Sequence, residues 1–316
     1  MRVCALAGGV GGAKLSAGLQ DALAPGDLSV VVNTADDFDP WGLRVCPDLD
    51  TVMYTLAGVA NPETGWGLAG ESFAFLEALS GYGEDVWFKL GDRDLATHVL
   101  RTHGLREGET LTAITAGLSG ALGVPVGVPG RILPMCDEKV STMLKTPAGL
   151  LEFQEYFVRR RQRDEVLGVD LVGIEDARPT GAVLEAVSGA DVIVFCPSNP
   201  VVSLGPILAV PGMRDALAAA TAPKVAVSPI VGGKALKGPA DRMLHSLGHE
   251  VSSAGVAALY EGLLDGMVVD RTDEGQRGEI EGLGMRVLAT DVVMHDPPDR
   301  ARLAREVLGF GAGLGA

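Results

Sequence analysis

The alternation of apolar runs with glycine-rich or polar segments predicts a strand–helix–strand unit at the amino terminus. Residues 2–7 form a short, mostly apolar run that ends at glycines, and residues 28–33 (LSVVVN) form a second run rich in valine. Residues 13–23 between them carry a helical pattern. Short apolar runs bounded by turn residues are typical of buried strands. Two such runs joined by a helix within about 30 residues predict a βαβ unit and a parallel sheet.

The same alternation of predicted strands and helices returns late in the chain, whereas the middle is mostly helical in pattern. Further strands are predicted at residues 191–196, 224–228, 266–270 and 285–289. Residues 50–123 read as helices, and residues 131–174 mix short strands with one amphipathic helix. We therefore predict a single α/β domain over residues 1–316. Its Rossmann-like core, a doubly wound and mainly parallel sheet, would comprise 1–50 and 180–310, with an inserted, mainly helical lobe at about 51–179.

The composition narrows the possible partners and compartments. The chain has 316 residues, 47% of them apolar, which is enough to bury a large core. Its 26 basic and 41 acidic residues give a net charge of -15, and such a chain repels nucleic acid and anionic membrane surfaces. Apolar runs are shorter than the roughly 18 residues of a membrane span. The four cysteines are isolated, which favours reduced thiols in the cytoplasm.

A glycine-rich segment joins the first predicted strand to the first predicted helix. It reads GGVGGAK from residue 8, so Gly9, Gly11 and Gly12 permit close approach of a ligand and Lys14 adds a positive charge. Free N–H groups at a helix amino terminus favour an anion, and we expect a phosphate here. Leu15 stands where a Walker A motif needs Ser or Thr, and the dinucleotide fingerprint needs glycine in place of Lys14. The alternative is a turn that only permits tight packing.

Acidic residues follow the second predicted strand and precede the next helix. Asp36 and Asp37 lie in NTADD, directly after the strand, and Asp48 and Asp50 lie in PDLDT. Both segments should meet at one rim of the sheet, where carboxylate oxygens suit Mg²⁺ together with substrate phosphates. Asp36 and Asp37 would repel each other if buried, so a cation or solvent must compensate them. Helix capping is the alternative, which we prefer for Asp48 but not for Asp50.

The segment FKLGDRDLATH at residues 88–98 carries the most distinctive charge pattern. A glycine turn precedes a predicted helix whose first turn holds Asp92 and Asp94, as the helix dipole favours. Arg93 between them could present a bidentate fork to a phosphate or a carbonyl. An ordinary capped helix with surface charges is the alternative, and His98 alone is weak evidence for a catalytic base.

Two polar loops follow later predicted strands. CPSNP contains Ser198 and Asn199, and SPIVGGK begins with Ser228. Ligands of doubly wound sheets bind at the carboxyl ends of strands, where these side chains can hydrogen-bond a base or a ribose. Ser, Asn, Pro and Gly are also ordinary turn residues, so either loop alone could be plain turn chemistry.

With these residues in view, the sequence resembles the 2-phospho-L-lactate transferase family nearly from end to end. Several motifs in fixed order make this resemblance far more specific than a single glycine loop. The glycine doublets of GGVGGAK are more similar to the bacterial branch of the family than to the archaeal one. The motifs are, in order, the glycine loop ending in Lys14, VVNTADD, CPDLDTVMYTL, KLGDRDLATH, ILPMCDEKVST, PSNPVVSLGPIL, VAVSPIVGGKAL and VSSAGVAALY.

The resemblance implies a fold and a reaction. The fold would be a Rossmann-like core with an added helical lobe, often in a homodimer. The acceptor would be 7,8-didemethyl-8-hydroxy-5-deazariboflavin, and the donor a guanosine diphosphate ester of lactate or, in bacterial members, of enolpyruvate. The products would be a precursor of coenzyme F420 and GMP, with magnesium required. Residues matching Asp50 and Arg93 would contact the deazaflavin or the reacting centre.

Attack of a ribityl hydroxyl on a diphosphate mainly requires in-line positioning and neutralisation of charge. We expect Mg²⁺, held by Asp37 and Asp50, to bridge the donor phosphates. Asp50 or Asp36 would orient or deprotonate the acceptor hydroxyl. Asp50→Asn should therefore abolish turnover while leaving thermal melting nearly unchanged. The expected substrate-binding residues are Gly9, Gly11, Gly12, Lys14, Asn33, Thr34, Asp50, Lys89, Asp92, Arg93, Ser198, Asn199 and Ser228.

Two other kinds of protein share parts of this pattern. A non-catalytic nucleotide-sugar-binding regulator of a related bacterial family has the core and the glycine loop, but a pure binder has no evident need for KLGDRD. An NAD-dependent dehydrogenase is disfavoured because the third glycine and the acidic end of the second strand are missing. The sequence thus favours the transferase.

Overall fold

A parallel sheet of seven strands forms the centre of the computed structural model, which describes residues 1–124 and 131–315. The strand order is β12-β11-β8-β7-β1-β2-β3, and every neighbouring pair is parallel. This order confirms the predicted doubly wound, Rossmann-like α/β fold. The strands are β1 (Val3–Ala7), β2 (Leu28–Val32), β3 (Arg131–Pro134), β7 (Val192–Phe195), β8 (Lys224–Val227), β11 (Gly266–Asp270) and β12 (Arg286–Thr290).

Both faces of the sheet are covered by helices, as an all-parallel sheet requires. Alternate residues of β1 serve the two faces: Ala5 joins one buried apolar cluster and Leu6 joins the other. The first cluster contains side chains of α1 (Gly9–Ala22), α2 (Pro47–Leu56), α5 (Leu111–Ala121) and α12 (Pro297–Leu314). The second contains side chains of α6 (Gly181–Ser188), α7 (Leu204–Ala209), α8 (Met213–Ala219), α10 (Ser253–Ala258) and α11 (Arg277–Gly282).

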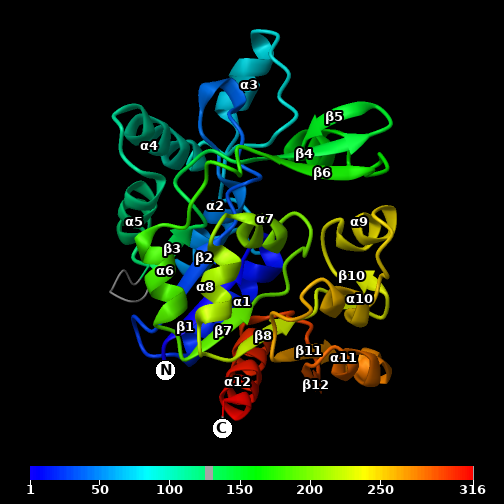
Figure 1. Cartoon of the computed structure of the whole chain (residues 1–316). Coiled ribbons are helices and arrows are strands. Elements are labelled where there is room, and N and C mark those ends of the chain that lie inside the picture. Colours follow the sequence, from blue (N-terminus) through cyan, green and yellow to red (C-terminus); the bar gives the residue numbers. More distant parts are fainter. Residues whose placement is uncertain (125–130, 316) are drawn as a thin grey trace.

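Smaller elements stand apart from the helices that cover the sheet, in the upper and right-hand parts of Figure 1. They include α3 (Ala74–Gly81) and an antiparallel sheet of β4 (Ser141–Thr146), β5 (Gly149–Glu152) and β6 (Gly168–Val172). Helix α4 (Asp94–Arg106) packs beside α5. A helical turn, η2 (Glu155–Arg159), follows β5. Below the antiparallel sheet in Figure 1 lie the hairpin of β9 (Ile230–Val231) and β10 (Lys234–Ala235), and α9 (Ala240–Ser246). Short helical turns η1 (Pro40–Gly42) and η3 (Arg271–Gln276) complete the elements.

The boundary predicted for the inserted lobe cuts through the central sheet. β3 lies within the range 51–179, yet it pairs with β2 along four residues. Short strands were expected within residues 131–174, but the four-residue sequence RILP is too short to show that this strand belongs to the central sheet. Residues 125–130, also within that range, lie outside the described part of the chain.

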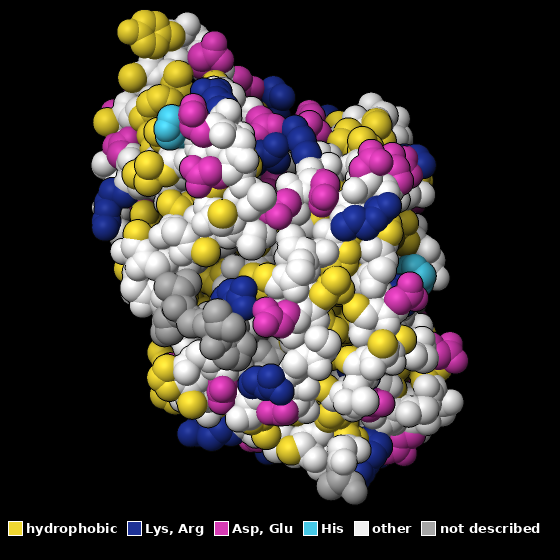
Figure 2. Space-filling view, turned by 60° about the vertical axis from the view of Figure 1, so that its left-hand side comes forward, with side chains coloured by type: hydrophobic (Ala, Val, Ile, Leu, Met, Phe, Trp, Pro, Cys, Tyr) yellow, Lys and Arg dark blue, Asp and Glu magenta, His cyan; other side chains and the backbone are white. Residues whose placement is uncertain are grey.

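The charged surface, the helices and the cysteines complete the description of the fold. Figure 2 shows acidic and basic side chains interspersed over one face, without a large patch of a single sign. In the described part of the chain, no helix combines the length and the apolar character needed to cross a bilayer. All four cysteines are buried free thiols, in agreement with the predicted absence of disulfides.

Candidate active site

A cavity of about 550 Å³ opens at the carboxyl ends of β1 and β7. From β1 the chain proceeds to β2 on one side, while β7 leads to β8 on the other, so the strand order reverses between them. Doubly wound sheets bind their ligands in the crevice at such a switch point. The cavity is lined by residues from the glycine segment, α2, the segment before α4, η2 and the loop after β7.

The glycine segment packs tightly against the loop after β7. Ser198 Oγ accepts a hydrogen bond from Gly8 N (3.0 Å) and donates one to Gly8 O (2.8 Å). A Cβ atom on Gly11 would stand 2.3 Å from the carbonyl oxygen of Pro197, and one on Gly12 would stand 2.6 Å from Ser198 Oγ. Close packing therefore requires these glycines, as the alternative interpretation of the sequence proposed. Helix α1 also begins at Gly9, four residues earlier than predicted.

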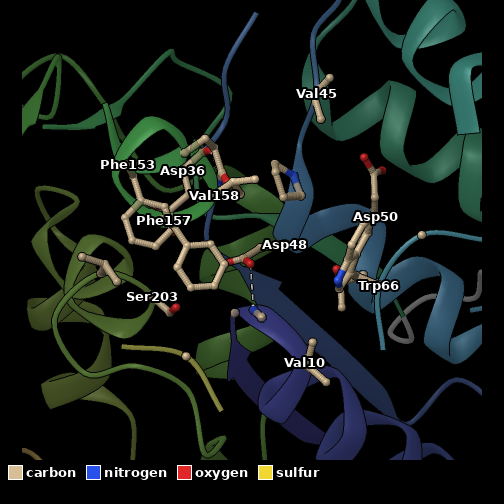
Figure 3. A pocket seen from close by; sticks show the side chains of 18 of the residues that line it. Val10, Asp36, Val45, Asp48, Asp50, Trp66, Phe153, Phe157, Val158 and Ser203 are labelled. Carbon is tan, nitrogen blue, oxygen red and sulfur yellow. Dashed lines mark hydrogen bonds between the residues drawn. The ribbon is translucent and has the colours of Figure 1, made fainter. Parts of the chain in front are cut away.

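Asp48 lies beside the start of α1, where we had expected a ligand phosphate. Its Oδ1 accepts a hydrogen bond from Gly9 N at 2.8 Å, the contact drawn as a dashed line in Figure 3. The preferred interpretation of Asp48 as a cap of its own helix is wrong, because Cys46 is the N-cap of α2 and no side chain caps that end. Asp48 instead ties α2 to the glycine segment across the floor of the cavity.

Asp36 and Asp48 form a pair of buried acids at the cavity. Asn33 Nδ2 donates to Asp36 Oδ2 (3.0 Å) and to Asp48 Oδ2 (3.1 Å), so the amide bridges the two carboxyl groups. Burial, and secondly the charge of Asp48, raises the pKa of Asp36 well above its usual value, and burial raises the pKa of Asp48 to about 6. Among the described residues, none makes a well-formed hydrogen bond to the buried Asp36 Oδ1. No cationic side chain of the described residues therefore neutralises the carboxyl groups of Asp36 and Asp48 through an ion pair.

Asp50 also lines the cavity, but its charge is already compensated. Arg101 of α4 donates to Asp50 Oδ2 through Nη1 at 3.1 Å and contacts Oδ1 through Nη2. His98 lies between two acids, with Nδ1 3.7 Å from Asp50 and Nε2 3.4 Å from Asp94. Tyr54 OH donates to Asp94 Oδ1 at 2.5 Å. These buried groups form one polar network that fixes the direction of the Asp50 carboxylate.

Aromatic side chains form two walls of the cavity. Phe153 and Phe157 are stacked, with ring centroids 5.4 Å apart and an interplanar angle of 9°. Trp66 lies on the far side of Asp48 from these rings in Figure 3. Trp87 and Phe88 also contribute to the lining. Flat apolar walls around a few polar groups suit a planar aromatic ligand.

The structure brings about half of the predicted site residues to the cavity. Those that line it are Gly9, Gly11, Asp36, Asp50, Lys89, Ser198 and Asn199. Asn33 supports the acids from behind, and Gly12 packs on Ser198. The residues that do not line the cavity are Gly12, Lys14, Asn33, Thr34, Asp37, Asp92, Arg93 and Ser228.

Several of these outlying residues have structural partners instead. Lys14 Nζ donates to Met294 O at 2.7 Å, and the guanidinium of Arg93 donates to Ala69 O at 2.8 Å. Asp92 accepts hydrogen bonds from the first backbone N–H groups of α3, so it does not belong to the first turn of α4, which begins at Asp94. Ser228 Oγ accepts a bond from Ser253 and from the backbone N–H of residue 230.

Asp37 is buried beside the site without lining the cavity. Burial raises its pKa to about 8, while a hydrogen bond with Cys46 and the charges of Arg44 and Arg101 oppose this rise. Its Oδ1 has no hydrogen-bond partner among the described residues.

Sequence reasoning missed Arg101, although one signal for it was present. Asp94, His98 and Arg101 stand at positions i, i+4 and i+7 of α4, which places them on one face of the helix. The aromatic wall at Phe153 and Phe157 had no comparable signal, because it approaches the site only through the fold of the small antiparallel sheet.

Comparisons with known proteins show the family of the chain. The family model described as 2-phospho-L-lactate transferase CofD matches residues 3–302. The chain belongs to the 2-phospho-L-lactate transferase CofD family. Its family relatives include a phosphoenolpyruvate transferase of Streptomyces griseus, 47% identical over 98% of both chains. A 2-phospho-L-lactate transferase of Methanosarcina barkeri is 39% identical over 96% of both chains.

The family resemblance inferred from the motifs is therefore confirmed, and the chain is a transferase of this CofD family. A solved structure of a UPF0052 family protein from Bacillus halodurans shares the fold, with a TM-score of 0.66 at 17% identity. It covers 97% of this chain and 98% of its own. At that identity the likeness supports the fold alone.

Proposed function

We propose that the enzyme transfers a phospholactyl or phosphoenolpyruvyl group from a guanosine diphosphate-linked donor to the ribityl hydroxyl of 7,8-didemethyl-8-hydroxy-5-deazariboflavin. The hydroxyl oxygen forms a new bond to phosphorus, the bond to GMP breaks, and the hydroxyl proton is released. The observation that carries the proposal is the single cavity at the switch point, which combines buried carboxylates with two aromatic walls. The aromatic walls suit the ring system of the acceptor, and the carboxylates suit a metal ion that binds the phosphates of the donor.

The cavity has groups that fit a magnesium ion. Among the described residues no cluster of three or more His, Cys, Asp or Glu could hold a metal alone. Mg²⁺ commonly uses one or two carboxylates and completes its shell with water and substrate phosphates. Asp36 and Asp48 suit this role, because Asp36 Oδ1 has no well-formed hydrogen bond among the described residues and burial raises the pKa of both acids. Bound there, Mg²⁺ would neutralise charge on the donor phosphates.

The predicted metal pair of Asp37 and Asp50 has less support. Both carboxylate oxygens of Asp50 already contact Arg101, and Asp37 does not line the cavity. Asp50 is better suited to accept a hydrogen bond from the acceptor hydroxyl, because the ion pair fixes its direction. Orientation of this kind matters most in phosphoryl transfer, where the protein mainly positions the reacting groups.

The donor most consistent with the relatives is the enolpyruvate ester. Relatives named phosphoenolpyruvate transferase, from Streptomyces griseus and Streptomyces coelicolor, are 47% and 46% identical to this chain. The Methanosarcina barkeri relative, named 2-phospho-L-lactate transferase, is 39% identical. We infer that the chain prefers the unsaturated three-carbon group.

Incubation with the deazaflavin, Mg²⁺ and each of the two donors tests this function. Mass spectrometry should detect a phosphodiester product and GMP, with faster turnover of the enolpyruvate donor. Asp36→Asn should lower turnover by about tenfold or more, equivalent to at least ~1.4 kcal/mol of the barrier. Absence of product with both donors would exclude the reaction, and equal rates would exclude the donor preference. The predicted homodimer can be tested in the same preparation by light scattering.

A further inference from the structure

A compact strap, residues 60–68, borders the cavity, which Trp66 and Gly67 of the strap line. Its two ends are joined by an antiparallel bridge between Ala60 and Leu68. Within it, the backbone N–H groups of Gly65 and Glu63 donate to the carbonyl and side-chain oxygens of Asn61, each at 2.9 Å. Trp66 of the strap lines the cavity. The strap is therefore an ordered loop with its own internal hydrogen bonds.

The tip of the strap is held from the opposite half of the chain. Lys237 Nζ donates to Thr64 O at 2.5 Å, across 173 residues of sequence. Lys237 lies in the segment before α9 and lines the cavity together with the neighbouring Gly238. A Cβ atom on Gly65 would stand 2.9 Å from Val10 of α1 and 3.1 Å from Lys237 Nζ. Strap, glycine segment and Lys237 thus meet at one point.

Positive charge gathers near this point, although the chain carries a net charge of -15. Lys14, Lys237 and Arg300 form no salt bridge with any acid among the described residues. Burial lowers the pKa of Lys14, and the charges of Arg300 and Lys237 lower it further. Partial burial also lowers the pKa of Lys237. An anion bound at the mouth would relieve this repulsion.

We propose that Lys237 binds a phosphate of the donor and that the strap positions its ammonium group through Thr64 O. This inference rests on the phosphorylated donor of the proposed function. A lysine ammonium has three N–H donors, and the carbonyl of Thr64 occupies one of them. The other two are available to phosphate oxygens, and hydrogen bonds between ions are about twice as strong as those between neutral groups. The strap therefore forms part of the donor site.

Titration calorimetry with GDP and with guanosine tests the role of Lys237. Lys237→Met should weaken GDP binding about tenfold or more while changing guanosine binding less than about twofold. It should also reduce the salt dependence of GDP affinity, because one ionic contact is lost. Lys234→Met, an exposed lysine of the same segment that does not line the cavity, is the matched control and should behave as the wild type.

The outcomes distinguish failure of the role of Lys237 from failure of the proposed nucleotide donor. Equal GDP affinity in Lys237→Met and the wild type overturns the role of Lys237 alone, and so does an equal loss for GDP and guanosine. Wild-type protein that binds no GDP overturns the nucleotide donor and Lys237's role together.

A second variant displaces the ammonium without removing it. Gly65→Ala places a Cβ against both Val10 and Lys237 at a backbone φ of +77°, so it should weaken GDP binding as well. Gly58→Ala, at a φ of +71° with nothing within 4 Å, controls for backbone strain and should leave GDP affinity unchanged. An unchanged affinity in Gly65→Ala would show that the strap does not position Lys237.

Discussion

Arg101 binds the carboxylate of Asp50 through both terminal guanidinium nitrogens, and the two side chains are only 1% and 7% exposed. Asp50 faces the cavity from α2, while Arg101 comes from α4. The pair therefore links α2 to α4 at the side of the cavity. Because this ion pair is buried, a substitution of Asp50 should change the stability of the protein as well as its activity.

Arg101→Met should destabilise the protein by about 3–5 kcal/mol, because it leaves a buried carboxylate without its partner. Urea denaturation measures this change, with Arg106→Met on the exposed end of the same helix as control. Asp50→Asn should likewise lower the melting temperature together with turnover, since it leaves Arg101 uncompensated. This replaces the expectation from sequence that Asp50→Asn would spare stability. A loss below about 1 kcal/mol in Arg101→Met would contradict the structural role of the pair.

Stability should fall as the pH rises through the range in which Asp37 loses its proton. Burial raises the pKa of Asp37 from its usual 3.8 to about 8, so between these values the folded state holds a proton that the unfolded state has lost. Its contribution to the free energy of unfolding therefore decreases from about pH 4 to about pH 8. Asp37→Asn should flatten this dependence. Denaturation at pH 5 and pH 8 compares the two proteins, and parallel losses would refute the assignment.

Gly11→Ala should push the glycine segment away from the loop that follows β7. The added methyl group would stand 2.3 Å from a backbone oxygen of Pro197, which cannot move aside as a flexible side chain could. We expect a loss of about 1–3 kcal/mol, typical of overpacking, and a lower turnover. Gly117→Ala in α5 meets nothing within 4 Å and should be neutral or stabilising by up to about 1 kcal/mol. Wild-type turnover and melting in Gly11→Ala would exclude the close contact.

Arg93→Ala distinguishes the role implied by family resemblance from the position seen in the structure. Arg93 is exposed, donates to Ala69 O and does not line the cavity, so its loss should change deazaflavin affinity less than about twofold. Phe157→Ala, which removes part of a cavity wall, should weaken the same ligand about tenfold. Fluorescence titration of the deazaflavin measures both. A tenfold loss in Arg93→Ala would instead support the direct contact that the resemblance implies.

The sheet could be predicted from the sequence because most of its strands are short, uniformly buried apolar runs. β11 spans the residues expected for it, and all five are buried. β3 was assigned to the inserted lobe and not to the sheet, because four residues ending in proline carry too little pattern. The acidic loops were placed at the correct rim because each follows or faces the end of a strand. Asp36, Asp50 and Ser198 accordingly line the cavity.

The partners of those residues could not be predicted, since they come from remote segments. Asp48 looks like an ordinary residue at a helix start, and only the fold shows that it accepts the Gly9 N–H from 39 positions away. Lys237 is unremarkable in sequence because its role depends on a carbonyl 173 residues earlier. Spacing predicts contacts within one helix, whereas contacts between helices depend on packing.

The central place of β1 has a consequence for synthesis of the chain. One edge of β1 pairs with β2, which follows it closely in the chain. The other edge pairs with β7, and the loop after β7 places Ser198 190 residues after Gly8. At about 5–20 residues per second, that edge stays open for ~10–40 s on the ribosome. An unpaired strand edge invites association with other chains. We therefore expect truncations before β7 to aggregate, and nascent chains to depend on protection until residue 198 emerges.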